Sequence, residues 1–110
     1  MQKLSLFFSI LILASCSAKL KTVTQADADR GNAKYNDVTL ASLQEGKSIF
    51  VGNCGKCHGL KDPTSRTEEK WNKIVPIMVK KVNKNGKDVK ITPDQESLLL
   101  KYLVTMSEAK

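Results

Sequence analysis

The chain has 110 residues, which is enough for a single domain. Hydrophobic residues make up 41% and charged residues 26%, and both fractions are ordinary for a globular protein. Aromatic residues make up only 5%, so a core built from side chains alone would be thin. Domains of this size often need a disulfide, a metal or a cofactor. The net charge of +7 suits a nucleic acid, an anionic membrane, an acidic protein, or simply a solvated basic surface.

Residues 1–15 have the pattern of an export signal. Lys3 precedes an apolar run over residues 4–14, which is too short to span a bilayer comfortably. The run ends at Leu13-Ala14-Ser15-Cys16, which resembles the lipobox of bacterial lipoproteins. We therefore expect a lipoprotein signal peptide over 1–15 and a lipid on the thiol of Cys16. The alternatives are ordinary secretion or a retained hydrophobic anchor.

Export places the domain on the periplasmic side of a bacterial membrane, where a nucleic-acid partner is not expected. Residues 16–38 are polar and poor in large apolar side chains. This composition predicts a lipidated tether, with a helical turn or two within Thr24–Tyr35. Residues 39–110 are then the folded domain.

Three helices are predicted in this domain, over Leu40–Asn53, Thr67–Val82 and Pro93–Met106. No segment has a convincing strand pattern, so the predicted fold class is all-α. The apolar positions that indicate the helices are Leu40, Leu43, Ile49, Phe50 and Val51, then Trp71, Ile74, Val75, Met78, Val79 and Val82, then Leu98, Leu99, Tyr102, Leu103 and Met106.

The expected helix ends depend on a few local signals. Ser65 or Thr67 suits the N-cap of the second helix, and Thr92 with Gln95 forms a capping box before the third. Pro76 lies inside the second helix and predicts a kink or a break there.

The residues with the most specific chemistry are Cys54-Gly55-Lys56-Cys57-His58, a C-x-x-C-H motif. In c-type haem attachment, two thiols at this spacing add to the haem vinyl groups, and the adjacent histidine binds the iron from the same side. The second ring nitrogen of the histidine can donate to a backbone carbonyl, which fixes the ring.

Other uses of these cysteines fit less well. A structural zinc site needs four ligands, but after Cys16 is lipidated only Cys54, Cys57 and His58 remain. A disulfide between Cys54 and Cys57, or a pair of redox-active thiols, stays open. The motif favours covalent haem, with two thiols on haem and one on lipid.

The flanks of the motif extend this interpretation. Glu45-Gly46-Lys47-x-x-Phe50-x-x-x-Cys54-x-x-Cys57-His58-Gly59, together with Tyr102-Leu103 in the last helix, resembles the single-haem class I cytochromes c. The resemblance covers about residues 40–104. It implies a small helical bundle around one covalently bound haem c, with Cys54 and Cys57 as thioethers and His58 as the proximal iron ligand.

The resemblance also implies a distal methionine ligand. Many relatives carry it in the loop before the last helix, but that loop, residues 84–91, has no methionine here. Trp71-x-x-Ile74-Val75-x-x-Met78 instead resembles a subset with a methionine on a helix, so Met78 is the expected ligand and Met106 the alternative. Trp71 is expected to pack near a haem propionate or to be a core or rim aromatic.

A haem iron held by His58 and Met78 suits electron transfer, so we expect an electron carrier and not an enzyme. Lysines 56, 61, 80 and 81 are expected to border the exposed haem edge and to attract acidic redox partners, or simply to be solvated. Two alternatives remain. One is an open or weakly capped distal site with gas-binding or peroxidase-like chemistry, and the other is a tethered subunit of one enzyme complex.

Overall fold

The computed structural model describes residues 20–54, 60–85 and 91–109, and within them it is all helical, without strands. The elements are α1 (Gln25–Tyr35), α2 (Leu40–Cys54), a short 3₁₀ helix η1 (Pro63–Ser65), α3 (Glu68–Asn85) and α4 (Pro93–Ser107). This confirms the predicted all-α class and the three predicted helices of the domain. The signal segment, residues 1–15, and Cys16 lie outside the described residues.

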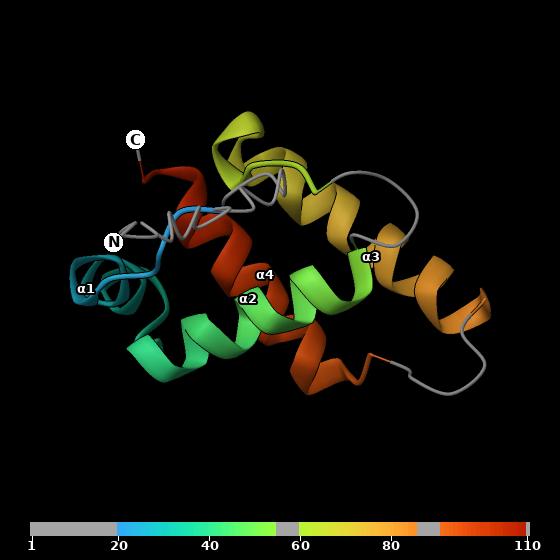
Figure 1. Cartoon of the computed structure of the whole chain (residues 1–110), viewed down its shortest axis with the longest axis horizontal. Coiled ribbons are helices and arrows are strands. Elements are labelled where there is room, and N and C mark those ends of the chain that lie inside the picture. The colour runs from blue at the N-terminus through green and yellow to red at the C-terminus, as the bar shows by residue number, and fades with distance from the viewer. Residues whose placement is uncertain (1–19, 55–59, 86–90, 110) are drawn as a thin grey trace, which may run out of the picture.

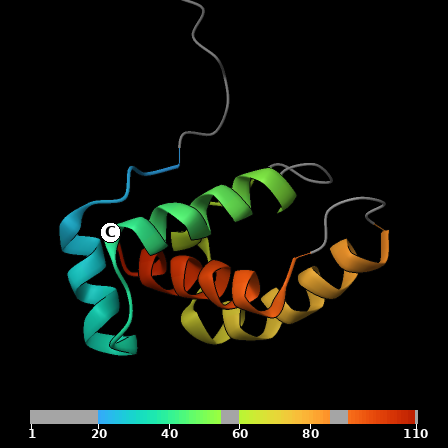
Figure 2. The same cartoon turned by 90° about the horizontal axis from the view of Figure 1, so that it is seen from below.

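Helix α4 occupies the centre of the molecule. Helices α2 and α3 both pack against it, from opposite sides, and α1 lies across one end of α4 and α2 (Figures 1 and 2). The short helix η1 also contacts α4. In the part of the chain that is described, no helix is both long and apolar enough to cross a membrane.

The ends of the helices follow the predicted capping signals. The Thr92 hydroxyl accepts from Gln95 N–H at 3.2 Å, and the Gln95 side chain accepts from Thr92 N–H at 2.9 Å, which completes the capping box of α4. Thr67, rather than Ser65, precedes α3, and its hydroxyl accepts from Lys70 N–H at 3.3 Å.

Helix α3 continues through Pro76 and is not split in two. A proline in a helix removes one hydrogen bond to the carbonyl four residues earlier, here that of Asn72. Both Pro76 and Asn72 are exposed, so water can satisfy the carbonyl on the outer side of the helix. The position of Pro76 on the solvent face therefore explains why the helix is not broken.

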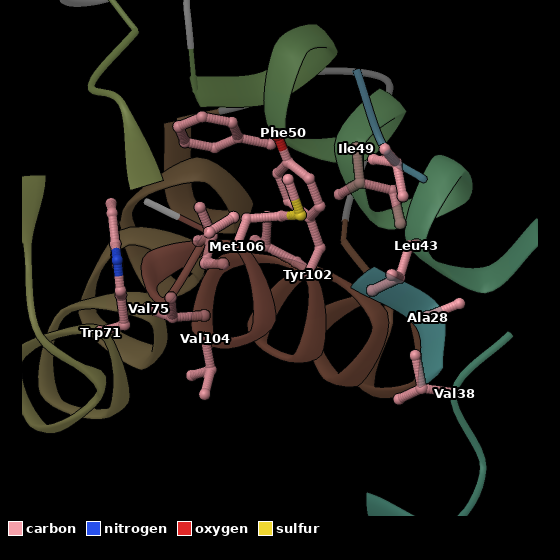
Figure 3. Close-up of a cluster of buried hydrophobic side chains, with 14 of the residues drawn as sticks. Ala28, Val38, Leu43, Ile49, Phe50, Trp71, Val75, Tyr102, Val104 and Met106 are labelled. Atoms are coloured by element: carbon pink, nitrogen blue, oxygen red, sulfur yellow. The ribbon is translucent and has the colours of Figure 1, made fainter. Parts of the chain in front are cut away.

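The core lies where α2, α3 and α4 meet, and aromatic rings join the helices (Figure 3). Phe50 of α2 contacts Trp71 of α3 edge to face at 6.3 Å between ring centroids, and Tyr102 of α4 at 6.1 Å. Val51, predicted to be on the buried face, is instead 46% exposed. Its neighbours Ile49 and Phe50 face inward, and the 100° step of the helix turns Val51 outward.

The segment predicted to be a tether differs from that prediction over its described part, residues 20–38. Helix α1 is three turns long, and Val23, Ala28 and Val38 are buried against the rest of the domain. The helix is stabilised by a capping box in which Asp27 and Thr24 bond to each other. Its buried surface consists of small residues, so the sequence lacks the large apolar pattern that usually indicates a packed helix.

A polar contact fixes α1 to α4. The Arg30 guanidinium donates to the Asp27 carboxylate and to the Thr105 carbonyl, both at 2.9 Å. Gly31 allows this close approach, since a Cβ there would lie 2.8 Å from Thr105 Oγ1 and from Val38 Cγ1. Residues 20–38 therefore belong to the folded domain.

Candidate functional site

Cys54, the first cysteine of the C-x-x-C-H motif, is the last residue of α2 and is half-buried. One turn earlier on the same side of the helix lie the buried Phe50 and the exposed Val51. Cys57 and His58 lie outside the described residues. The structure therefore describes the start of the motif and the helix that leads into it.

The helix that carries Cys54 crosses α4 at very short range. Gly46 faces Tyr102, and a Cβ on Gly46 would lie 2.6 Å from Tyr102 Cβ and would also collide with the Leu98 carbonyl. One turn after Gly46, Phe50 packs on the Tyr102 ring. Three flanking residues of the sequence pattern, Gly46, Phe50 and Tyr102, thus meet at one helix crossing, and the fourth, Leu103, is buried.

Tyr102 is 1% exposed, and its environment holds the phenol neutral. Burial raises the pKa of Tyr102 to about 12, and the negative charge of Asp62 adds to the rise. The phenol therefore stays neutral at physiological pH. It serves as a packing surface between α2 and α4.

Trp71 is fully buried in the core, where its ring contacts Phe50. Its indole N–H donates to the Pro63 carbonyl at 2.9 Å, which uses the only donor of the side chain. The Arg66 guanidinium lies over the ring, 5.1 Å from its centroid. Trp71 therefore ties η1 to the start of α3 and occupies a core position.

The two candidate distal ligands have different surroundings. Met106 of α4 is 2% exposed and lies in the cluster with Phe50 and Tyr102 (Figure 3). Met78 of α3 is half-buried, as is Ile74 one turn before it. The thioether of Met78 is thus the one that is not enclosed by the core.

Exposed apolar side chains lie close in sequence to both Cys54 and Met78. The exposed large hydrophobic residues among those described are Val51, at 46%, and Ile77, at 57%. Val51 is three residues before Cys54 and Ile77 is next to Met78. The C-terminal end of α2 and the C-terminal half of α3 lie at the same end of the molecule in both views (Figures 1 and 2).

The described residues hold no group of three or more His, Cys, Asp or Glu side chains that could bind a bare metal ion. Lys61, Lys80 and Lys81 are exposed, while Lys56 lies outside the described residues. The structure thus leaves these three lysines accessible to a partner.

Two contacts that organise the domain were not predicted. The Asn83 side-chain amide accepts from Ile91 N–H at 2.7 Å and donates to the Ile91 carbonyl at 3.1 Å, which holds the end of α3 beside the start of α4. The other is the Asp27–Arg30 contact with Thr105. The Thr24-x-x-Asp27 capping box was a visible signal for α1, whereas nothing local in the sequence indicates the Asn83 contact.

No family model, curated protein or solved structure matches the chain.

Proposed function

We propose that this protein is an exported, lipid-anchored c-type cytochrome that carries electrons on one covalent haem. The observation that carries the proposal is the Cys54-Gly55-Lys56-Cys57-His58 motif at the end of α2. Support comes from the crossing of that helix with α4 at Gly46 and Tyr102, because the resemblance to class I cytochromes c depends on the same residues.

The chemistry of the described residues fits a haem. Cys54 carries a thiol at a helix end, which could add to a haem vinyl group, and Met78 carries a thioether of the kind that binds iron in cytochromes c. Val51, three residues before Cys54, and Ile74, one turn before Met78, leave apolar surface incompletely covered. A flat apolar group would remove such surface from water.

Each residue has a distinct part in the proposed site. Cys54 and Cys57 would hold the haem through two thioethers, and His58 and Met78 would bind its iron. When bound, the haem supplies an iron that exchanges single electrons, and methionine ligation raises its reduction potential. If both His58 and Met78 bind the iron, no site would remain on it for a substrate, so the proposed role is that of a carrier.

The test is the alkaline pyridine spectrum of the full chain, exported from a host that attaches haem to cytochromes c. A reduced spectrum of the two-thioether type, retained after acid extraction, is expected for the wild type. Cys54→Ser and Cys57→Ser should each alter the spectrum or lose the haem. A wild-type chain whose haem is extracted completely by acidified solvent would refute covalent attachment.

Cys16→Ser is the matched control, because it removes a cysteine without touching the motif. It should retain the haem spectrum but lose the lipid, so that metabolic labelling with a radioactive fatty acid marks the wild type and not the variant. This outcome would support the lipid anchor at Cys16. Equal labelling of the Cys16→Ser variant, or no label on the wild type, would refute the lipid at Cys16.

The proposed partners are redox proteins with acidic docking surfaces. Support comes from the net charge of +7 and from the exposure of Lys61, Lys80 and Lys81. If neither Met78 nor Met106 binds iron, the distal position would be open, and gas binding or peroxidase-like activity would be the better explanation.

A further inference from the structure

The described chain enters the domain on the α2 side and is fixed there within a few residues. The Lys47 side chain of α2 donates to the Lys21 carbonyl at 3.2 Å, and the Lys21 side chain donates to the Ala109 carbonyl at 3.2 Å. Leu20 packs against the core, and Val23 is buried in it. The packed part of the described chain therefore starts at Leu20.

This start leaves only a short link to the proposed lipid. Four peptide links separate Cys16 from Leu20 and reach at most ~14 Å, whereas the sequence predicted a tether over residues 16–38. A lipid on Cys16 lies in the bilayer, so the domain would be held close to the headgroups with its entry side toward them. The lipid at Cys16 is part of the proposed function, on which this orientation rests.

One side of α2 lies beside the entry point. Lys47, Val51 and Cys54 follow one another at spacings of four and three residues, so they line one side of the helix. Lys21 is exposed beside Lys47, and Val51 is 46% exposed. The start of the described chain and α2 lie on one side of α4, and α3 lies on the other (Figure 2). We call Lys21, Lys47 and Val51 the α2 entry face.

The α2 entry face has the chemistry of a surface that rests on anionic lipid. Lys21 and Lys47 place positive charge next to the short link, and Lys19 adds a third positive charge within the link. Basic residues this close to a membrane are attracted by its anionic headgroups. Val51 adds an exposed apolar side chain, which can enter the boundary between headgroups and acyl chains.

Acidic groups near this face offset it only in part. Glu45 is exposed on α2, but it is two residues from Lys47 and hence about 200° away around the helix. Hydrogen bonds from Thr64 hold the pKa of Asp62 below its usual value, and the charge of Lys21 lowers it further, so Asp62 is ionised near Lys21. Its carboxylate is already bonded to the N–H and the hydroxyl of Thr64.

We propose that the α2 entry face rests on the headgroups of an anionic membrane, beside the lipid on Cys16. The short link, the lysines and the exposed valine all point to the same side of the molecule. Cys54 lies on this side of α2, three residues after Val51, so the proposed haem site would be held beside the membrane. Its electron partners would then be proteins bound in or on the same membrane.

The experiment measures how fast each lysine of the lipidated full chain is acetylated by a water-soluble reagent, on vesicles that contain phosphatidylglycerol. Mass spectrometry reports each lysine separately. The comparison chain has a Gly-Ser insert of about 20 residues between Ala18 and Lys19, which lets the domain move roughly 25 Å from its lipid. Lys47 should react roughly fivefold more slowly in the native chain, as expected if the membrane covers it about four-fifths of the time. Lys73, on α3, should react within about twofold in the two chains.

Val51 and Ile77 provide a matched pair of variants. Both side chains are exposed, at 46% and 57%, but they belong to helices on opposite sides of α4. Val51→Glu should remove most of the protection of Lys47, because the anionic headgroups repel a glutamate. Ile77→Glu should leave that protection within about twofold of the native chain. Thermal denaturation of each variant verifies that it is folded.

Three results would overturn the proposal. These are equal protection of Lys47 and Lys73, protection of Lys73 alone, and slow acetylation of Lys47 that persists in the comparison chain. The last result would mean that the fold, and not the membrane, shields Lys47.

Fatty-acid labelling of the same samples separates this proposal from the proposed function. A labelled chain with unprotected Lys47 would contradict only the orientation, whereas an unlabelled chain would contradict the lipid at Cys16 and the orientation with it. None of these readouts needs haem. A haem-free chain with protected Lys47 would contradict the proposed electron transfer and leave the membrane face standing.

Discussion

Gly46 of α2 lies so close to Tyr102 of α4 that a methyl group at position 46 would be 2.6 Å from Tyr102 Cβ. The helix that delivers Cys54 is thereby held against the central helix. Gly46→Ala should therefore lower the free energy of unfolding by about 2 kcal/mol, because neither backbone can move away cheaply. Urea denaturation measures the change.

Gly52→Ala is the control for this prediction. Gly52 lies in the same helix but meets no described atom within 4 Å of an added Cβ, so alanine should stabilise the protein by about 0.5–1 kcal/mol. Equal stability of the two variants would show that the crossing at Gly46 is not as close as described.

The contact between Asp27 and Arg30 predicts a loss of stability in acid. Burial would raise the pKa of Asp27, but bonds from the Thr24 N–H, from Arg30 and from the Thr24 hydroxyl, with the Arg30 charge, hold it below 3.8. The stabilisation is therefore complete above that value and disappears as the pH falls through the lower folded-state pKa.

Asp27→Asn should cost about 2 kcal/mol at neutral pH and much less at pH values below the folded-state pKa. Urea denaturation at several pH values measures both. Asp29→Asn is the control, since Asp29 accepts a bond from the side chain of the exposed Gln25 and, among the described residues, from no other group. If the free energy of unfolding of the wild type still exceeded that of Asp27→Asn by the same amount in strong acid, the predicted sign of this pH dependence would be wrong.

Tyr102 predicts a loss of stability in alkali. Its pKa is 10.0 in an ordinary environment and about 12 in the fold, mainly because of burial. The neutral phenol therefore stabilises the fold fully below about pH 10, and this contribution is lost as the pH rises toward 12. The melting temperature of Tyr102→Phe should fall less between pH 10 and 12 than that of the wild type. The melting temperature of Tyr35→Phe should fall nearly as much as that of the wild type. An unchanged fall in Tyr102→Phe would mean that another group is responsible.

The sequence predicted the helices wherever large apolar residues repeat and a cap is present. Thr92, Pro93 and Gln95 fixed the start of α4, whereas α1 was underestimated because its buried residues are small or charged, as at Ala28, Gly31 and Asp27. The direction of Val51 and the continuation of α3 through Pro76 depend on which helix face meets a neighbour, and that is set by tertiary packing. The C-x-x-C-H motif is recognised from its spacing alone. Spacing does not decide whether Met78 or Met106 is the distal ligand of the proposed site.

Met78 and Met106 offer a matched pair for assigning the distal ligand. Leucine keeps the volume of methionine but removes the sulfur, so Met106→Leu should preserve the core at a cost below about 1.5 kcal/mol. Met78→Leu should abolish the far-red band that methionine ligation gives a ferric haem, while Met106→Leu should keep it. Loss of the band only in Met106→Leu would assign the ligand to the core methionine and refute Met78.

The far-red absorption spectrum of the ferric wild-type protein tests the carrier role most directly. We expect the weak charge-transfer band of an iron held by His58 and Met78, together with a reduced protein that does not bind carbon monoxide readily. Absence of the band with ready binding of carbon monoxide would contradict an electron carrier and indicate an open distal site.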